Sequence, residues 1–282
     1  MKTVTGRALL IHAVLTHLLL ILFAISKAAQ FSYPVGARAG AVGNASCTLS
    51  DVWSAFTNQA GLGYVHHINV ASNYENRFLL PELSIKSFAL AIPLKGTTFA
   101  LSGTSMGYHL YSENKYGLGL GKAFGDKIAA GVQMDYLQTQ IGEGYGNKST
   151  MTVELGLIAK PVRNLVIGMH VFNPVRSKLT NYNNERISTI LKAGAAYSFS
   201  EKVLLLAEVS KDNIQAAQFK AGLEYHPVPQ LFLRGGMGTN PVSLAFGIGF
   251  HLSQLKIDIS SAYQQVLGYT PQASLVYCFS HE

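Results

Sequence analysis

The chain has 282 residues, of which only 13% are charged, and its formal net charge is +7 at pH 7. It is rich in Gly (27 residues), Tyr and Phe (14 each), a composition typical of transmembrane β-barrels and atypical of soluble α/β enzymes. The positive charge is not gathered into a basic stripe, so the sequence does not predict a nucleic-acid partner.

The first 28 residues have the features of a secretory signal peptide. Lys2 and Arg7 precede an apolar run over 8–25, and Ser26-Lys27-Ala28 places small residues where a signal peptidase cuts. An uncleaved membrane anchor is the alternative, because a run of about 18 residues can just span a bilayer. We expect cleavage after Ala28, which leaves 19 basic and 15 acidic side chains in the mature chain.

Residues 29–62 form a separate segment between the signal and the first predicted strand. The sequence over 36–63 is rich in Gly and Ala, too irregular for a transmembrane helix and too short for a domain. We therefore expect this segment to be a plug inside the barrel that follows. Its candidate contact residues are Arg38, Gly40, Asp51, Trp53, Phe56, Asn58 and Gly61.

A long series of alternating segments follows, each with an apolar face and a polar or small-residue face. In the clearest case, 242–252, one face carries Val242, Leu244, Phe246, Ile248, Phe250 and Leu252. Such alternation is typical of strands that separate lipid from a wet lumen. A β-sandwich would also alternate, and the pattern alone leaves that alternative open.

About fourteen such segments fill the rest of the chain. They are 63–74, 82–94, 97–110, 114–124, 127–141, 149–160, 163–172, 185–199, 202–211, 215–226, 229–238, 241–252, 254–264 and 269–280. Short turns such as Lys95-Gly96 alternate with longer polar connections, of which 173–184 is the longest. Bacterial barrels place the short turns in the periplasm and the longer loops outside. We predict an all-β fold, a transmembrane antiparallel up-and-down barrel of about fourteen strands over 63–282.

Polar side chains of both signs recur on the faces predicted to point inward. The lumen-facing candidates are Asp135, Glu154, His170, Lys192, Glu208, Lys220, Glu224, Arg234, Lys256 and Asp258. A structural network that pairs charges and holds the plug is one interpretation, and a path for a ligand or ion is the other.

The sequence predicts no metal site, cofactor or catalytic centre. The only cysteines, Cys47 and Cys278, form no CxxC motif, but an exported chain could join them in a disulfide that ties the plug to the wall. The glycines of 117–121 lie in a strand pattern without a following helix, so a phosphate loop is not indicated. An embedded hydrolase is the alternative of another class, but no Gly-x-Ser-x-Gly elbow is present.

Four short stretches carry a resemblance: 37–40 (Ala-Arg-Ala-Gly), 43–45 (Gly-Asn-Ala), 50–55 around Asp51, and 58–62 (Asn-Gln-Ala-Gly-Leu). They resemble the N-terminal segment of the FadL-like outer-membrane barrels, in particular the PorV/PorQ branch found in Bacteroidetes. Gln59 stands where that branch usually has proline. Phe279, near the C-terminus, resembles the aromatic signal read by the barrel-assembly machinery.

The resemblance implies an outer-membrane location and one of two functions. FadL-type members are channels for hydrophobic small molecules with an N-terminal hatch, which is the expectation we adopt for this chain. PorV-type members are components of the type IX secretion system and receive secreted proteins, and a purely structural barrel is a third alternative. Outer-membrane lipid is a further expected partner, because Arg176 and Lys178 in the longest loop could meet lipopolysaccharide phosphates; a merely solvated loop is the alternative.

Overall fold

The structure is a computed structural model that describes residues 31–142, 146–178 and 186–279. The predicted signal peptide lies outside the described residues. Within the described part of the chain, no helix is both long and apolar enough to cross a membrane.

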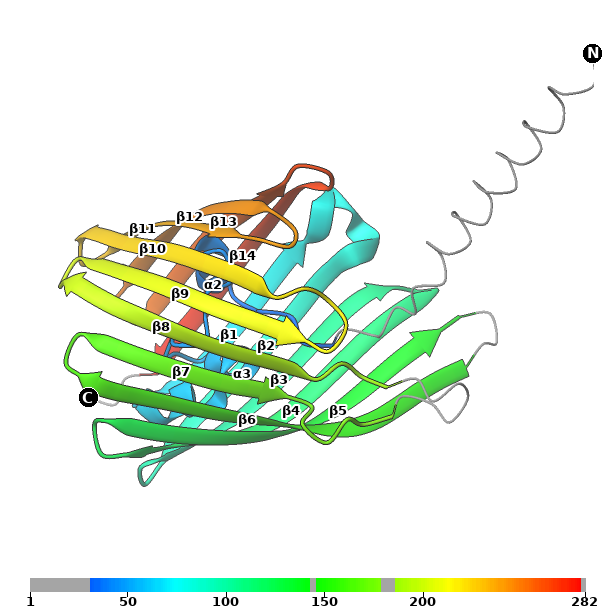
Figure 1. Cartoon of the computed structure of the whole chain (residues 1–282), viewed down its shortest axis with the longest axis horizontal. Helices are drawn as coiled ribbons and strands as arrows, with labels where there is room; N and C mark the ends of the chain where they lie inside the picture. The colour runs from blue at the N-terminus through cyan, green and yellow to red at the C-terminus, as the bar shows by residue number, and fades with distance from the viewer. Residues whose placement is uncertain (1–30, 143–145, 179–185, 280–282) are drawn as a thin grey trace, which may run out of the picture.

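The described chain forms a closed antiparallel barrel in which each strand pairs with its neighbours in sequence and β1 pairs with β14 (Figure 1). This confirms the predicted all-β, up-and-down barrel of fourteen strands, and it rules out the sandwich. The strands are β1 (Ile68–Asn76), β2 (Ser84–Leu94), β3 (Thr97–Tyr108), β4 (Tyr111–Phe124), β5 (Ile128–Ile141), β6 (Gly146–Val162), β7 (Leu165–Phe172), β8 (Ile190–Ser200), β9 (Val203–Asp212), β10 (Gln218–Val228), β11 (Leu231–Gly238), β12 (Ser243–Leu252), β13 (Leu255–Gln264) and β14 (Gly268–Phe279).

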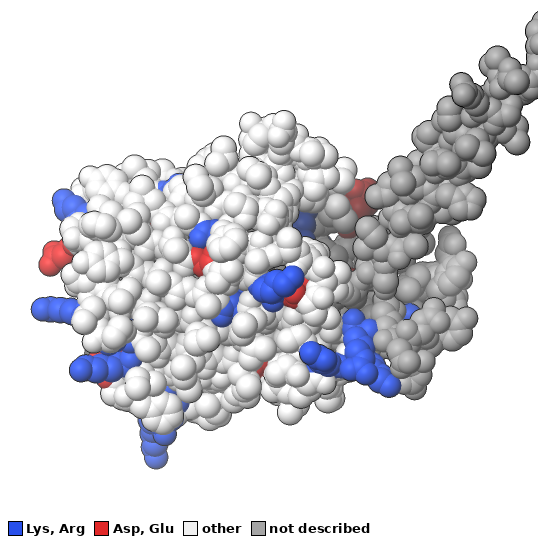
Figure 2. Space-filling model, in the orientation of Figure 1, with Lys and Arg blue, Asp and Glu red and all other residues white. Residues whose placement is uncertain are grey.

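The alternation in sequence sets which face of each strand meets lipid. In β12, Leu244 and Phe246 are 55% and 58% exposed on the outer wall, whereas Ala245 between them is buried. Large apolar side chains on the outside suit the hydrocarbon of a bilayer. The face drawn in Figure 2 is accordingly mostly uncharged, with several Lys and Arg side chains projecting at its two ends.

The connections at the two ends of the barrel differ in length. Lys95 and Gly96 join β2 to β3 with φ of 49° and 79°, the positive values that a two-residue hairpin turn requires. At the opposite end, the connection from β7 to β8 is the longest, and its residues 179–185 lie outside the described part. Outer-membrane barrels keep short turns on the periplasmic side, so we assign the first end to the periplasm.

Residues 31–65, which we call the lumenal segment, lie inside the barrel (Figure 1). The segment contains two short helices, α2 (Ala37–Ala41) and α3 (Ser54–Thr57), and a 3-10 helix, η1 (Gln59–Tyr64). Helix α2 packs against β12, β13 and β14, and η1 packs against β4, β5 and β6, so the segment touches opposite parts of the wall. The predicted strand start at residue 63 is wrong, because η1 continues through Tyr64 and β1 begins at Ile68.

Two small insertions complete the described chain. The 3-10 helices η2 (Arg77–Leu79) and η3 (Pro81–Leu83) connect β1 to β2, and Phe78 and Leu79 take positive φ there. This connection lies at the end of the barrel that we assign to the cell exterior.

Candidate functional site

Three glutamates of the barrel wall bind the lumenal segment, and we call them the anchor carboxylates. Glu154 lies on β6, Glu208 on β9 and Glu224 on β10, and all three side chains are buried. Each accepts hydrogen bonds from a different part of the segment. Together they bind the segment at three places along its length, and we take these contacts as the candidate functional site.

Glu224 binds the segment through Arg38 at the start of α2. Arg38 Nε and Nη2 donate to the two carboxylate oxygens of Glu224 at 2.9 and 2.8 Å, a bidentate geometry. Arg234 Nε donates to the same carboxylate at 2.5 Å, and its Nη1 donates to Asp258 at 2.6 Å. Asp51 of the segment pairs with Arg38 Nη1 at 3.2 Å. Burial opposes the charge on Arg38, but Glu224 and Asp51 raise its pKa above the ordinary value, so the guanidinium stays charged.

Glu208 binds the backbone of the segment rather than a side chain. The amides of Ser46 and Cys47 donate to Glu208 Oε2 at 2.9 and 2.8 Å, and Lys220 Nζ donates to Oε1 at 2.9 Å. Burial, together with the charge of Glu208, raises the pKa of the Cys47 thiol to about 12. Cys47 is therefore an unreactive thiol as long as the segment stays in place.

Glu154 binds the segment through Gln59, whose Nε2 donates to Oε2 at 2.7 Å. His170 Nε2 lies 2.7 Å from the same oxygen, and Lys115 Nζ pairs with Oε1. Lys115 also stands 3.7 Å from Asp135, so one buried cation serves two buried carboxylates. Such a cluster is costly to disturb, because removing one partner leaves a buried charge unpaired.

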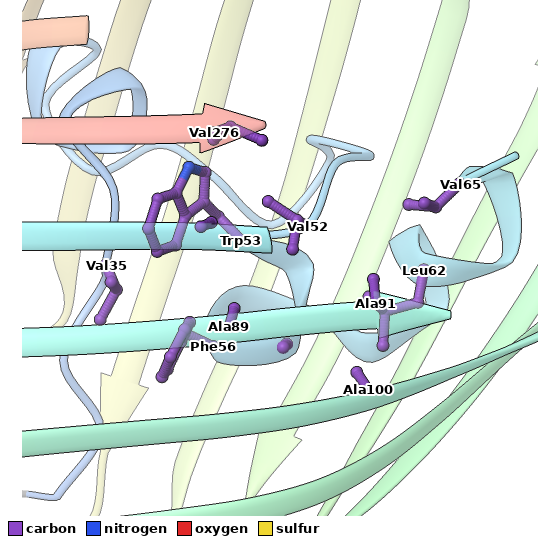
Figure 3. Close-up of a cluster of buried hydrophobic side chains, with 12 residues drawn as sticks. Val35, Val52, Trp53, Phe56, Leu62, Val65, Ala89, Ala91, Ala100 and Val276 are labelled. Carbon is purple, nitrogen blue, oxygen red and sulfur yellow. The ribbon is translucent and has the colours of Figure 1, made fainter. Parts of the chain in front are cut away.

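An apolar cluster fills the space between the segment and strands β1, β2, β3 and β14 (Figure 3). Trp53, Phe56 and Leu62 from the segment are 4%, 2% and 0% exposed. They pack against small wall residues that include Ala89 and Ala91. The barrel wall therefore covers all three side chains in this arrangement.

Glycine on the wall lets the segment approach closely. A Cβ atom at Gly222 would lie 2.6 Å from Val42 Cβ, far closer than real Cβ contacts, so only glycine fits. Gly43 of the segment has φ +66° and faces the backbone of Met237, with 2.7 Å from its ideal Cβ position to Met237 N. Gly40 faces Gln272, and Gly61 is packed against Leu49 and Ser54 within the segment.

Asn58 fixes the start of η1. Its Oδ1 accepts from Ala60 N at 3.2 Å, while Nδ2 donates to Cys47 O at 2.7 Å and to Leu157 O on β6 at 3.2 Å. One side chain thus joins two parts of the segment to the wall. This explains why the chain forms a 3-10 turn here instead of beginning the first strand.

The structure places all the predicted lumen residues on the inner face of the wall. Eight of them are buried, and Lys220 and Lys256 are half-buried. Lys256 lines a cavity of about 240 Å³ near the periplasmic end, together with Asp51, Trp53 and Asp258. The eight buried residues are Asp135, Glu154, His170, Lys192, Glu208, Glu224, Arg234 and Asp258.

The two cysteines are free thiols, so of the two alternatives, a disulfide between them and two free thiols, the structure has the second. Cys47 packs near Gly168 and Gly194, whereas Cys278 Sγ lies 2.6 Å from Asn69 Oδ1 on β1. An inward place on the last strand for Cys278 and a place in the lumenal segment for Cys47 do not specify the distance between the two thiols. Among the described residues, no group of three or more His, Cys, Asp or Glu is placed to hold a metal ion.

Comparisons with known proteins bear on the fold. No protein-family model matches the sequence, and no curated protein matches it either. Solved structures do match. A deltaS2 mutant of the monoaromatic hydrocarbon channel TodX has a TM-score of 0.67 at 11% identity, covering 89% of this chain and 100% of that one. The fold is that of the FadL and TodX barrels.

Two further structures agree with this assignment. The Pseudomonas putida toluene transporter TodX has a TM-score of 0.62 at 11% identity, covering 89% of this chain and 98% of its own. A Pseudomonas aeruginosa FadL homologue has a TM-score of 0.60 at 11% identity, covering 89% and 100%. At 11% identity, the likeness shows that this chain shares the fold of these barrels.

One buried residue of the lumen is missing from the sequence prediction. Lys115 is 5% exposed and pairs with Glu154, yet it was not among the lumen candidates. It lies on the same face of β4 as Gly117, Gly119 and Gly121, the face opposite Leu118. Extending that parity by one step would have placed Lys115 inside the barrel.

Proposed function

We propose that this protein is an outer-membrane transporter for small hydrophobic molecules, and that the lumenal segment is its plug. The observation that carries the proposal is the set of three anchor carboxylates, each bound to a different part of the segment. Each anchor carboxylate also binds a cation of the wall, Arg234, Lys220 or Lys115, so none is left as an unpaired charge when the segment shifts. Transport then requires the plug to shift within the barrel.

Two observations support a hydrophobic solute. The TodX structures with the same fold are named as a toluene transporter and a monoaromatic hydrocarbon channel. In addition, the contact between plug and wall contains the apolar cluster around Trp53, Phe56 and Leu62. A shift of the plug would uncover this cluster and give an apolar solute a surface to cross.

A reversible lock on the plug tests the proposal. An ideal Cβ at Gly194 on β8 lies 3.6 Å from Cys47 Cβ, within the roughly 3.5–4.5 Å that disulfides span. In a Gly194→Cys variant, oxidation should therefore join the plug to the wall through the native Cys47. Gly194→Ser is the matched control, since it adds similar bulk without a second thiol.

The readout is the uptake of radiolabelled toluene into cells that produce each protein. We expect oxidant to suppress uptake by the Gly194→Cys variant and reductant to restore it, while the Gly194→Ser variant responds to neither. Uptake that continues through the oxidised, cross-linked protein would refute a moving plug. No uptake by the wild type, combined with co-purification of secretion-system proteins, would favour the PorV-like alternative.

A further inference from the structure

A second cavity, of about 260 Å³, lies on the exterior side of the lumenal segment. Its floor includes Ser32 and Asn44 of the segment. Its walls come from the exterior ends of several strands, such as Lys192 near the start of β8 and Thr270 near the start of β14. A solute arriving from outside meets this cavity before it meets the plug.

The charges that line this cavity are mostly positive. Among the described lining residues, three are cations, Arg77, Lys192 and Lys220, and one is a carboxylate, Glu75. Arg77 pairs with Glu75 at 2.7 Å, and Lys220 pairs with Glu208 at 2.9 Å. Lys192 is therefore left as the cation without an ion-pair partner among the described residues.

Lys192 is 4% exposed, and its Nζ makes no hydrogen bond to any described residue. The carboxylates nearby are already engaged. Glu208 binds Lys220 and two backbone amides, and Glu154 binds Lys115, Gln59 and His170. A buried ammonium without a partner is costly, and a bound anion would remove that cost.

A second polar group at the cavity is also unsatisfied. Ser32 Oγ is buried and has no hydrogen-bond partner among the described residues. It offers one neutral donor from the lumenal segment, while Lys192 offers three charged donors from the wall. Both residues line the cavity, so an oxyanion bound there would be offered donors from the wall and from the segment, whereas a hydrocarbon would leave both groups unpaired.

We propose that this exterior cavity binds the oxyanion group of a small water-soluble organic anion, either a carboxylate or a phosphate, with Lys192 as its principal ligand. The site is distinct from the apolar cluster, and it stands whether or not the protein transports hydrophobic molecules. Lys192 supplies the charge, and Ser32 makes the bound anion sensitive to the position of the lumenal segment.

Isothermal titration calorimetry of the full-length protein in an uncharged detergent tests this site. The probes are benzoate, phenyl phosphate and, as a neutral analogue of similar shape, benzyl alcohol. We expect at least one anion to bind and benzyl alcohol not to bind. Lys192→Gln should weaken anion binding by about tenfold or more, the size of a lost charge-assisted hydrogen bond.

Lys127→Gln is the matched control, because Lys127 is exposed in the turn between β4 and β5 and lines neither cavity. If Lys192→Gln loses the heat-modifiable gel migration of a folded barrel, Lys192→Arg and Ser32→Ala replace it. Arginine should keep anion binding, and the Ser32 variant should weaken it.

Binding of only one anion supports the proposal and identifies the oxyanion as carboxylate or phosphate. Three results would overturn it: no binding of either anion, equal binding of benzyl alcohol, or binding that is unchanged by Lys192→Gln in folded protein. Where Lys192→Arg and Ser32→Ala are used instead, the proposal is overturned if Lys192→Arg loses anion binding and Ser32→Ala binds the anion as well as the wild type does.

Discussion

The contact between Arg38 and Glu224 should set how often the lumenal segment leaves its place. Replacing Arg38 with Met keeps most of the side-chain length but removes the two hydrogen bonds to Glu224 and the ion pair with Asp51. In the variant, Glu224 still pairs with Arg234, so its buried charge is not left alone. The Arg38 side chain is also 23% exposed, so we expect a smaller loss of free energy than for a fully buried ion pair.

The expected loss is about 2 kcal/mol, taken from the range for hydrogen bonds to charged groups. At about 1.4 kcal/mol per factor of ten, the displaced form of the segment should become roughly thirtyfold more populated. Cys47 reports this population, because it is 1% exposed when the segment is in place. A maleimide can reach it only when the segment moves.

The assay is the rate of Cys47 labelling in a Cys278→Ser background, followed by mass spectrometry. Arg38→Met should raise that rate by roughly thirtyfold. Arg163→Met is the matched control, because Arg163 is exposed in the turn between β6 and β7. A rate within twofold of the wild type, in a barrel that still shows heat-modifiable migration, would refute the idea that this contact holds the segment.

Three other predictions follow from the same geometry. The rate of Cys47 labelling should rise about tenfold per pH unit from pH 7 to 10. The segment in its place raises the thiol pKa to about 12, so ionisation of the thiol at higher pH favours the displaced segment. A labelling rate that levels off near the ordinary thiol pKa of about 8.5 would contradict this. Gly222→Val should cost about 1–3 kcal/mol by overpacking against Val42 and lower the temperature of heat-modified migration, whereas Gly235→Val on the lipid face should not. An epitope inserted after Val175 should be labelled on intact cells, and labelling only after permeabilisation would mean that the assigned orientation is inverted.

The barrel could be predicted from sequence because its signal is local. Each strand has one face toward lipid and one toward the lumen, so apolar and polar residues alternate over about ten positions and identify the face that meets lipid. In β12, every second residue from Leu244 onward is apolar and points outward. The start of β1 was misjudged because Gly63 and Tyr64 continue the alternating pattern, while the Asn58 side chain diverts the backbone into η1.

The contacts of the site depend on information that is not local. Parity placed Glu224 inside the barrel, but its pairing with Arg38 joins residues 186 positions apart in sequence. Such a pairing depends on the register of the strands and on the path of the lumenal segment. The absent Cys47–Cys278 disulfide has the same origin, because inward parity says nothing about which of the fourteen strands a lumenal residue faces.

The pairing of β1 with β14, with Ile68 opposite Phe279, has a consequence for the order of assembly. Two residues, His66 and His67, connect the lumenal segment to β1, so the segment is covalently attached to the first strand of a closed barrel. Once β1 and β14 have paired, the wall of the barrel has no gap between strands through which the segment could enter. The segment must therefore be gathered inside while the sheet is still open, or travel lengthwise through an end afterwards. Any entry of the segment after the barrel has closed must therefore run parallel to the axis of the barrel.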